Sequence, residues 1–281
     1  MNKRFWGFAA TAALVALAAV PASAHRQWMM PSSTVLSGDD VWVTVDAAVS
    51  NDLFYFEHQP MRLDALKAWA PDGTEAAIEN KATGRYRSTF DVHLTQKGTW
   101  RIASVSDGLM GSYDLNGKTE RLPRGTTTAN LAEKIPAGAT NVQTAESNNR
   151  NEIFVTVGEP TTTLFKPTGK GIELVPVTHP NDLISGEAAT FQFLLDGKPT
   201  AGLPVTIIPG GIRYRDQLGQ IDLKTDAEGK VEVTWPEAGM YWVNVTTPRS
   251  ERPEGEGAPE AAPAAPQRRA SYVTTLEVMA P

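Results

Sequence analysis

The chain has 281 residues, no cysteine and a formal net charge of −6. The missing cysteines exclude disulfides, thiolate metal sites, a cysteine nucleophile and a lipid anchor attached to cysteine. The excess of acidic side chains argues against nucleic acid or an anionic membrane as a partner, and the length allows two modest domains.

The first predicted element is a secretory signal peptide over residues 1–24. Lys3 and Arg4 supply its positive start, residues 5–20 supply an apolar stretch, and small residues lead up to Ala24. We therefore expect cleavage after Ala24, export to the periplasm and a mature protein that is not inserted in the membrane. Cleavage would leave 24 basic and 32 acidic side chains.

Strands dominate the chain that follows. Apolar and polar residues alternate over residues 41–46, 86–94 and 100–105, which is typical of antiparallel strands with one buried face. These strands predict an N-terminal β-sandwich domain over 25–160. Residues 111–151 are polar and rich in glycine, so we expect a loop there, with one short helical turn at 130–135 at most.

A second series of short strands begins near residue 171. They are expected over 172–177, 189–195, 203–208, 221–225, 231–235, 240–245 and 271–278. This rhythm predicts a C-terminal immunoglobulin-like β-sandwich domain over 165–281, with the boundary between 158 and 171. Residues 248–269 have the low complexity of a disordered loop, which would join the last two strands. The predicted fold class is all-β, with two immunoglobulin-like antiparallel β-sandwich domains after the signal peptide.

His25 directly follows the expected cleavage site. As the first residue of a mature protein it would offer two metal ligands, its free α-amine and its ring Nδ1. An α-amine with a pKa of about 7.7–8.0 and an imidazole with a pKa of about 6.5 lose their protons to a metal at little cost. With a second histidine these groups form a histidine brace. A histidine that sits loose in solvent is the alternative.

Three other histidines are candidates for the missing nitrogen: His58, His93 and His179. His58 ends an aromatic run beside Glu57, which could act as a metal ligand or as a hydrogen-bond acceptor behind the ligand. An exposed histidine in the turn before Pro60 is an equally good interpretation.

His93 lies two residues after Asp91, so both side chains point to the same face of an expected strand. Asp91 and His93 could therefore form half of a site that His25 completes, or simply belong to a solvated outer face. His179 precedes Pro180 in an expected turn, where a structural role is favoured.

The remaining aromatic residues and motifs give no sign of catalysis. The tryptophans at 28, 42, 69, 100 and 242 are assigned to core and sheet packing. The sequence has no Gly-x-Ser-x-Gly, no nucleotide-binding glycine loop and no His-Glu-x-x-His. We therefore do not expect an enzyme.

Several segments together resemble a known family. They are residues 24–31 (AHRQWMMP), 50–56 (SNDLFYF), 177–183 (VTHPNDL), 195–199 (LDGKP) and 235–242 (WPEAGMYW). The chain resembles domain-of-unknown-function family 4198, periplasmic proteins described as components of nickel or cobalt uptake systems. This resemblance implies a metal-handling role for the protein.

The sequence thus predicts a periplasmic protein that binds Ni, Co or Cu through His25, with His58 or His93 as the third nitrogen ligand and Asp91 as an oxygen ligand or supporting residue. Its expected partners are the metal ion and a membrane metal transporter. The alternatives are a copper chaperone, a copper-brace oxidative enzyme, and a metal-free module that binds carbohydrate or protein.

Overall fold

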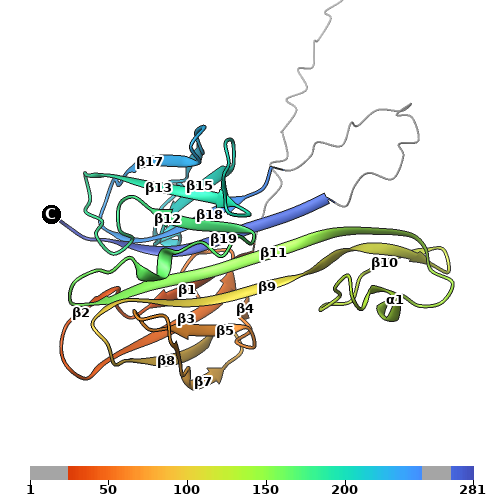
Figure 1. Ribbon diagram of the computed structural model, residues 1–281, viewed down its shortest axis with the longest axis horizontal. Helices are drawn as coiled ribbons and strands as arrows, with labels where there is room; N and C mark the ends of the chain where they lie inside the picture. Colours follow the sequence, from red (N-terminus) through yellow and green to blue (C-terminus); the bar gives the residue numbers. More distant parts are fainter. Residues whose placement is uncertain (1–24, 249–266) are drawn as a thin grey trace, which may run out of the picture.

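The structure is a computed structural model that describes residues 25–248 and 267–281, and it is built almost entirely of strands (Figure 1). The signal-peptide prediction lies outside the described residues. The elements of the first half are β1 (Arg26–Pro31), β2 (Val35–Leu36), β3 (Val41–Ser50), β4 (Gln59–Pro60), β5 (Leu66–Trp69), β6 (Glu75–Ala76), β7 (Glu79–Thr83), β8 (Ser88–Leu94), β9 (Gly98–Leu115), β10 (Lys118–Arg121), α1 (Leu131–Lys134) and β11 (Thr140–Val157).

The second half continues with short strands and two single 3₁₀ turns. Its elements are η1 (Thr163–Phe165), β12 (Ile172–Pro176), β13 (Ala188–Leu195), β14 (Lys198–Pro199), β15 (Pro204–Pro209), η2 (Ile212–Tyr214), β16 (Ile221–Lys224), β17 (Lys230–Thr234), β18 (Gly239–Thr246) and β19 (Gln267–Val278). No helix in the described residues is long and apolar enough to span a membrane.

Three sheets organise these strands. A five-stranded sheet has the order β1-β3-β8-β7, with β4 also paired to β3. A four-stranded sheet contains β12, β13, β14 and β17. A ten-stranded sheet runs β16-β15-β18-β19-β11-β9-β5-β6, with β10 and β2 attached to β9 and β11. In Figure 1, β9, β11 and β19 cross the middle of the molecule between the strands of the two smaller sheets.

Two hydrophobic cores fill the spaces between the sheets. The first contains side chains of β1, β3, β8, β9 and β11, among them Met29, Phe90 and Trp100. The second contains side chains of the C-terminal half, among them Trp235 and Tyr272. Alternating strands thus place their apolar faces inward as the sequence predicts, because period-2 alternation puts every second side chain on one face.

The C-terminal half also has the corner found in immunoglobulin-like domains. Tyr241 at the start of β18 donates a hydrogen bond from its hydroxyl to the backbone carbonyl of Glu237, 2.8 Å away. The predictions of an all-β fold and of immunoglobulin-like β-sandwiches are confirmed. The division into domains at 158–171 stays a prediction, since the ten-stranded sheet continues through both halves by the parallel pairing of β11 with β19.

A third, small hydrophobic cluster joins the two halves of the molecule close to His25. Trp28 and Ala48 from the first half pack with Ile208 and Trp242 from the second. The indole Nε1 of Trp242 also donates to the backbone carbonyl of Gln27, 3.0 Å away. The beginning of β1 is therefore held by both halves of the molecule.

The loop predicted over residues 111–151 is wrong at both ends, although residues 122–139 form a loop that holds only α1. β9 extends to Leu115 and β11 begins at Thr140, and together they form a long ribbon that carries β10 and α1 at its far end (Figure 1). Most of the ribbon's outer residues are exposed or only half-buried, so neither face imposes the apolar alternation by which a strand is recognised in sequence. The short helical turn expected at 130–135 is present as α1.

The end of the chain follows the prediction in part. β19 pairs antiparallel with β18, so the strand expected over 271–278 is indeed the neighbour of the strand before it. β19 already begins at Gln267, which makes the predicted loop end at 269 too late. Residues 249–266, on which the disorder prediction falls, lie outside the described residues.

Candidate metal centre

His25 and His58 meet at one end of β3. β1 and β4 pair with opposite edges of this strand, and Val49 is the partner of Gln27 on one side and of Gln59 on the other. His25 and His58 each precede these strands closely, so they flank the same end of β3. Two strand spacings separate their backbones, about 10 Å, which two histidine side chains can span.

The two imidazole rings lie against each other. Their centroids are 3.9 Å apart and their planes differ by 10°, so the rings are stacked. Both residues are exposed to solvent. Within the described part of the chain, no hydrogen bond holds a nitrogen of either ring. A shared ion would require both rings to turn out of this stack.

Residues next to the histidines tie them to the turn after β3. Arg26 donates from Nη1 to the backbone carbonyl of Asn51, 2.8 Å away. Glu57 accepts the backbone N–H groups of Asn51 and Asp52 on one carboxylate oxygen, at 2.6 and 3.1 Å. Glu57 thus accepts from the backbone of the turn, and its predicted role as a metal ligand or as an acceptor behind a ligand stays a prediction.

Burial and neighbouring groups shift the pKa of both Glu57 and Arg26. Burial raises the pKa of Glu57, but the N–H groups of Asp52 and Asn51 and the charge of Arg213 outweigh it and leave the pKa below its ordinary value. Burial lowers the pKa of Arg26, and the negative charge of Asp52 opposes that change.

An aromatic floor supports the turn from below. Trp28 packs against Phe54 and Phe56, with ring centroids 5.4 and 5.6 Å away. The indole Nε1 of Trp28 donates to Ser50 Oγ at 2.8 Å, and both residues are fully buried. Phe54 adopts a positive φ of 61°, and it lies so close to Gly210 that a Cβ there would come within 2.9 Å of its ring.

His93 and Asp91 lie near the other end of β3. His93 is the cross-strand partner of Trp42, which precedes Ser50 by eight residues, about 26 Å along an extended strand. His93 Nε2 is 2.8 Å from a carboxylate oxygen of Asp40. Asp91 accepts hydrogen bonds from Thr44 Oγ1 at 2.6 Å and from the side-chain amide of Asn80 at 2.7 Å. The structure therefore does not bring either residue to His25.

His179 fits the structural role expected of it. Its Nδ1 accepts the backbone N–H of Asn181 at 3.1 Å, and its Nε2 lies 3.0 Å from Thr99 Oγ1. Burial lowers the pKa of His179, while the carbonyl of Thr161 and the charge of Asp182 oppose the shift. The neutral ring therefore links the first half of the molecule to the turn before β13.

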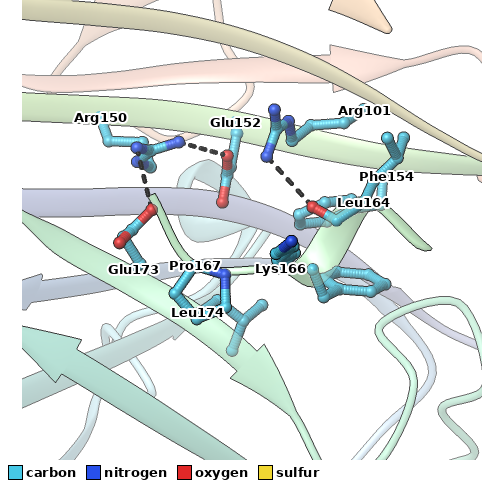
Figure 2. Close-up of a pocket in the computed structure, with 10 residues that line it drawn as sticks. Arg101, Arg150, Glu152, Phe154, Leu164, Lys166, Pro167, Glu173 and Leu174 are labelled. Carbon is cyan, nitrogen blue, oxygen red and sulfur yellow. Dashed lines mark hydrogen bonds and ion pairs between the residues drawn. The ribbon is translucent and has the colours of Figure 1, made fainter. Parts of the chain in front are cut away.

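A buried ionic cluster below β11 has no open space for a ligand (Figure 2). Arg150 lies between Glu152 and Glu173, at 3.3 and 3.4 Å, and all three side chains are buried. Burial alone would raise the pKa of Glu173, but hydrogen bonds from Thr168 and Gly169 and the charge of Arg150 lower it. The adjoining cavity measures about 10 Å³, the room of roughly one water molecule.

The described residues contain no group of three or more His, Asp or Glu side chains that could hold a metal ion. A histidine brace does not need one, since it takes three nitrogens from two residues. In the full sequence the backbone nitrogen of His25 belongs to the peptide bond with Ala24. A brace at His25 would therefore need that bond to be cleaved.

Comparison with known proteins places the chain in a family. The family described as Domain of unknown function (DUF4198) matches residues 22–249, which is most of the sequence. The chain belongs to this family. The matched region begins just before His25 and includes the whole turn that carries His58.

Other comparisons add little to this DUF4198 assignment. No curated protein matches the chain. Among solved structures, the D0-D1 domain of Intimin is 11% identical, with 89% of this chain and 97% of that chain covered and a TM-score of 0.21. The structure titled Escherichia coli alpha-2-macroglobulin activated by porcine elastase is 12% identical, with 90% and 30% covered and a TM-score of 0.21. We take no function from either.

Proposed function

We propose that the mature protein is a periplasmic carrier of a divalent transition metal, bound by His25 and His58. His25 would supply its α-amine and ring Nδ1, and His58 would supply one ring nitrogen. The observation that carries this proposal is the stacked pair of exposed imidazoles, 3.9 Å apart, beside the expected cleavage site. Export through a cleaved signal and delivery of the ion to a membrane transporter complete the proposal.

The chemistry of the donors narrows the range of ions. One amine and two imidazoles suit Ni(II), Co(II), Cu(II) and Zn(II), and Cu(II) binds such nitrogen sites most tightly. Nickel or cobalt is the physiological ion we propose, on the resemblance to uptake components. His93 and Asp91 are left out of the ligand set, because they lie near the other end of β3 from His25.

Calorimetric titration of protein that begins at His25, against Ni(II), Co(II) and Cu(II), tests this function. We expect one ion per chain and a ranking of the three ions. His25→Ala is the direct control, since it removes the ring and leaves an amine with no chelating partner. Binding of none of the ions, or equal binding by the His25→Ala variant, would refute the proposal.

A further inference from the structure

Asn51 is bound from both sides of the candidate metal centre. Arg26 directly follows His25 and donates to the carbonyl of Asn51 at 2.8 Å. Glu57 directly precedes His58 and accepts the N–H of Asn51 at 2.6 Å. The residue next to each histidine therefore forms a hydrogen bond to the backbone of Asn51.

This shared contact restricts both histidines at once. Consecutive Cα atoms are about 3.8 Å apart, so each histidine backbone lies one residue from a side chain that is bonded to Asn51. The second N–H that Glu57 accepts, from Asp52 at 3.1 Å, closes the turn between β3 and β4. These side-chain contacts add to the backbone pairing that already holds β1 and β4 on β3.

The side chains of Arg26 and Glu57 are themselves held in place by further contacts. The guanidinium of Arg26 lies 5.9 Å from the ring centroid of Trp242, whose indole donates to Gln27. The positive charge of Arg213 attracts Glu57, and the same guanidinium lies 4.1 Å from the ring centroid of Tyr55. The second half of the molecule thus contributes to the position of both histidines.

We propose that Arg26 and Glu57 are positioning residues, which use the backbone of Asn51 as a common anchor and hold His25 and His58 together before a metal arrives. This inference rests on the proposed function. A pair assembled in advance spends less conformational entropy on binding, so its affinity is higher. The rings are together while the nitrogen of His25 is still in the bond to Ala24, so cleavage adds a third nitrogen to an assembled pair.

Two substitutions of Glu57 separate positioning from general stability. Glu57→Ala removes the acceptor, and we expect it to weaken Cu(II) binding by about 10-fold, the size typical of residues that orient metal ligands. Glu57→Gln keeps an acceptor oxygen and should restore most of the affinity. Glu75→Ala is the matched control, because that exposed carboxylate pairs with Lys67.

Pulsed electron paramagnetic resonance of the Cu(II) protein gives the decisive readout, since it counts coordinated imidazoles. We expect two in the wild type and in Glu57→Gln, and one in a large fraction of Glu57→Ala. Arg26→Ala repeats the test if Glu57→Ala does not fold. Two imidazoles and unchanged affinity in the alanine variants would overturn the inference and leave the proposed function standing. A wild type without metal affinity would overturn both.

Discussion

The two ends of β3 carry similar ring pairs with different chemistry. At one end His25 stacks on His58, with centroids 3.9 Å apart and planes 10° from parallel. At the other end Trp42 stacks on His93, with centroids 4.3 Å apart and planes 1° from parallel. Both pairs are at the surface, and both join residues of neighbouring strands or turns. Stacking by itself therefore does not distinguish a metal centre from a packing contact.

The difference lies in the donors that each end can offer. The indole of Trp42 has no lone pair free for a metal, and His93 already contacts Asp40. The carboxylate of Asp91 accepts hydrogen bonds from Thr44 and Asn80. At the first end two imidazoles face each other, and a cleaved chain would add an amine. Strand register therefore decides which histidine lies beside His25.

The largest contrast is expected between two single substitutions. His58→Ala should weaken metal binding by more than about 100-fold, because loss of a ligand exceeds the usual cost of losing an outer partner. His93→Ala should leave the metal affinity unchanged, since His93 lies near the other end of β3 from His25. Titration of both variants with the same ion checks this pair. A large loss of metal affinity in His93→Ala would contradict a metal centre at the His25 end of β3.

The second prediction concerns a pair of histidines placed at the Trp42 end of β3. In a His25→Ala background, Trp42→His would place a second imidazole beside His93. This pair has no amine, so we expect binding weaker than the natural site by at least about tenfold, the smallest loss that even an outer partner causes. Equal affinity would mean that the amine of His25 contributes nothing.

Stability should differ between the ends as well. Ser50→Ala removes the buried hydroxyl that accepts from Trp28 Nε1 and should cost about 1–3 kcal/mol of unfolding free energy, because a buried donor is left without its partner. Thr44→Ala, on the exposed face near the other end, should change it by no more than about 0.5 kcal/mol. Denaturant unfolding measures both, and equal losses would contradict this account of the buried floor.

The smallest predicted effect is a dependence on pH. Hydrogen bonds from the turn hold the pKa of Glu57 below its ordinary value, so its ionised form stabilises the folded state above that ordinary value. This contribution is lost as the pH falls through the lowered pKa. Glu57→Gln should therefore lose less unfolding free energy than the wild type between about pH 5 and pH 3. A steeper loss in the variant would mean that the carboxylate does not stabilise the turn.

Much of the fold follows from local patterns in the sequence. The alternation over 41–46 and 100–105 predicts β3 and the buried half of β9, because one face of each packs in a core. The ribbon over 111–151 escaped prediction, since its exposed residues carry no such pattern. Trp42 was assigned to core and sheet packing; 41% of it is exposed, and its indole stacks on its cross-strand partner His93.

The candidate site was predictable only in part. The sequence identifies His25 from the cleavage pattern, but it leaves His58 and His93 as equal partners. The choice depends on which residues of β3 pair with β8 and β4, and pairing register is not visible in one strand alone. The grip of Arg26 and Glu57 on Asn51 depends on the shape of a turn with a positive φ at Phe54, which nothing in the composition specifies.

Copper titration of two proteins tests whether the free amine of His25 is a metal ligand. Two proteins are titrated with Cu(II) under the same conditions, one beginning at His25 and one that retains Ala24 in front of it. Both have the same imidazoles and differ in whether the nitrogen of His25 is an amine or an amide. We predict that the retained Ala24 weakens binding by more than about 100-fold, beyond the range of outer-partner losses. Equal affinity of the two proteins would contradict the account.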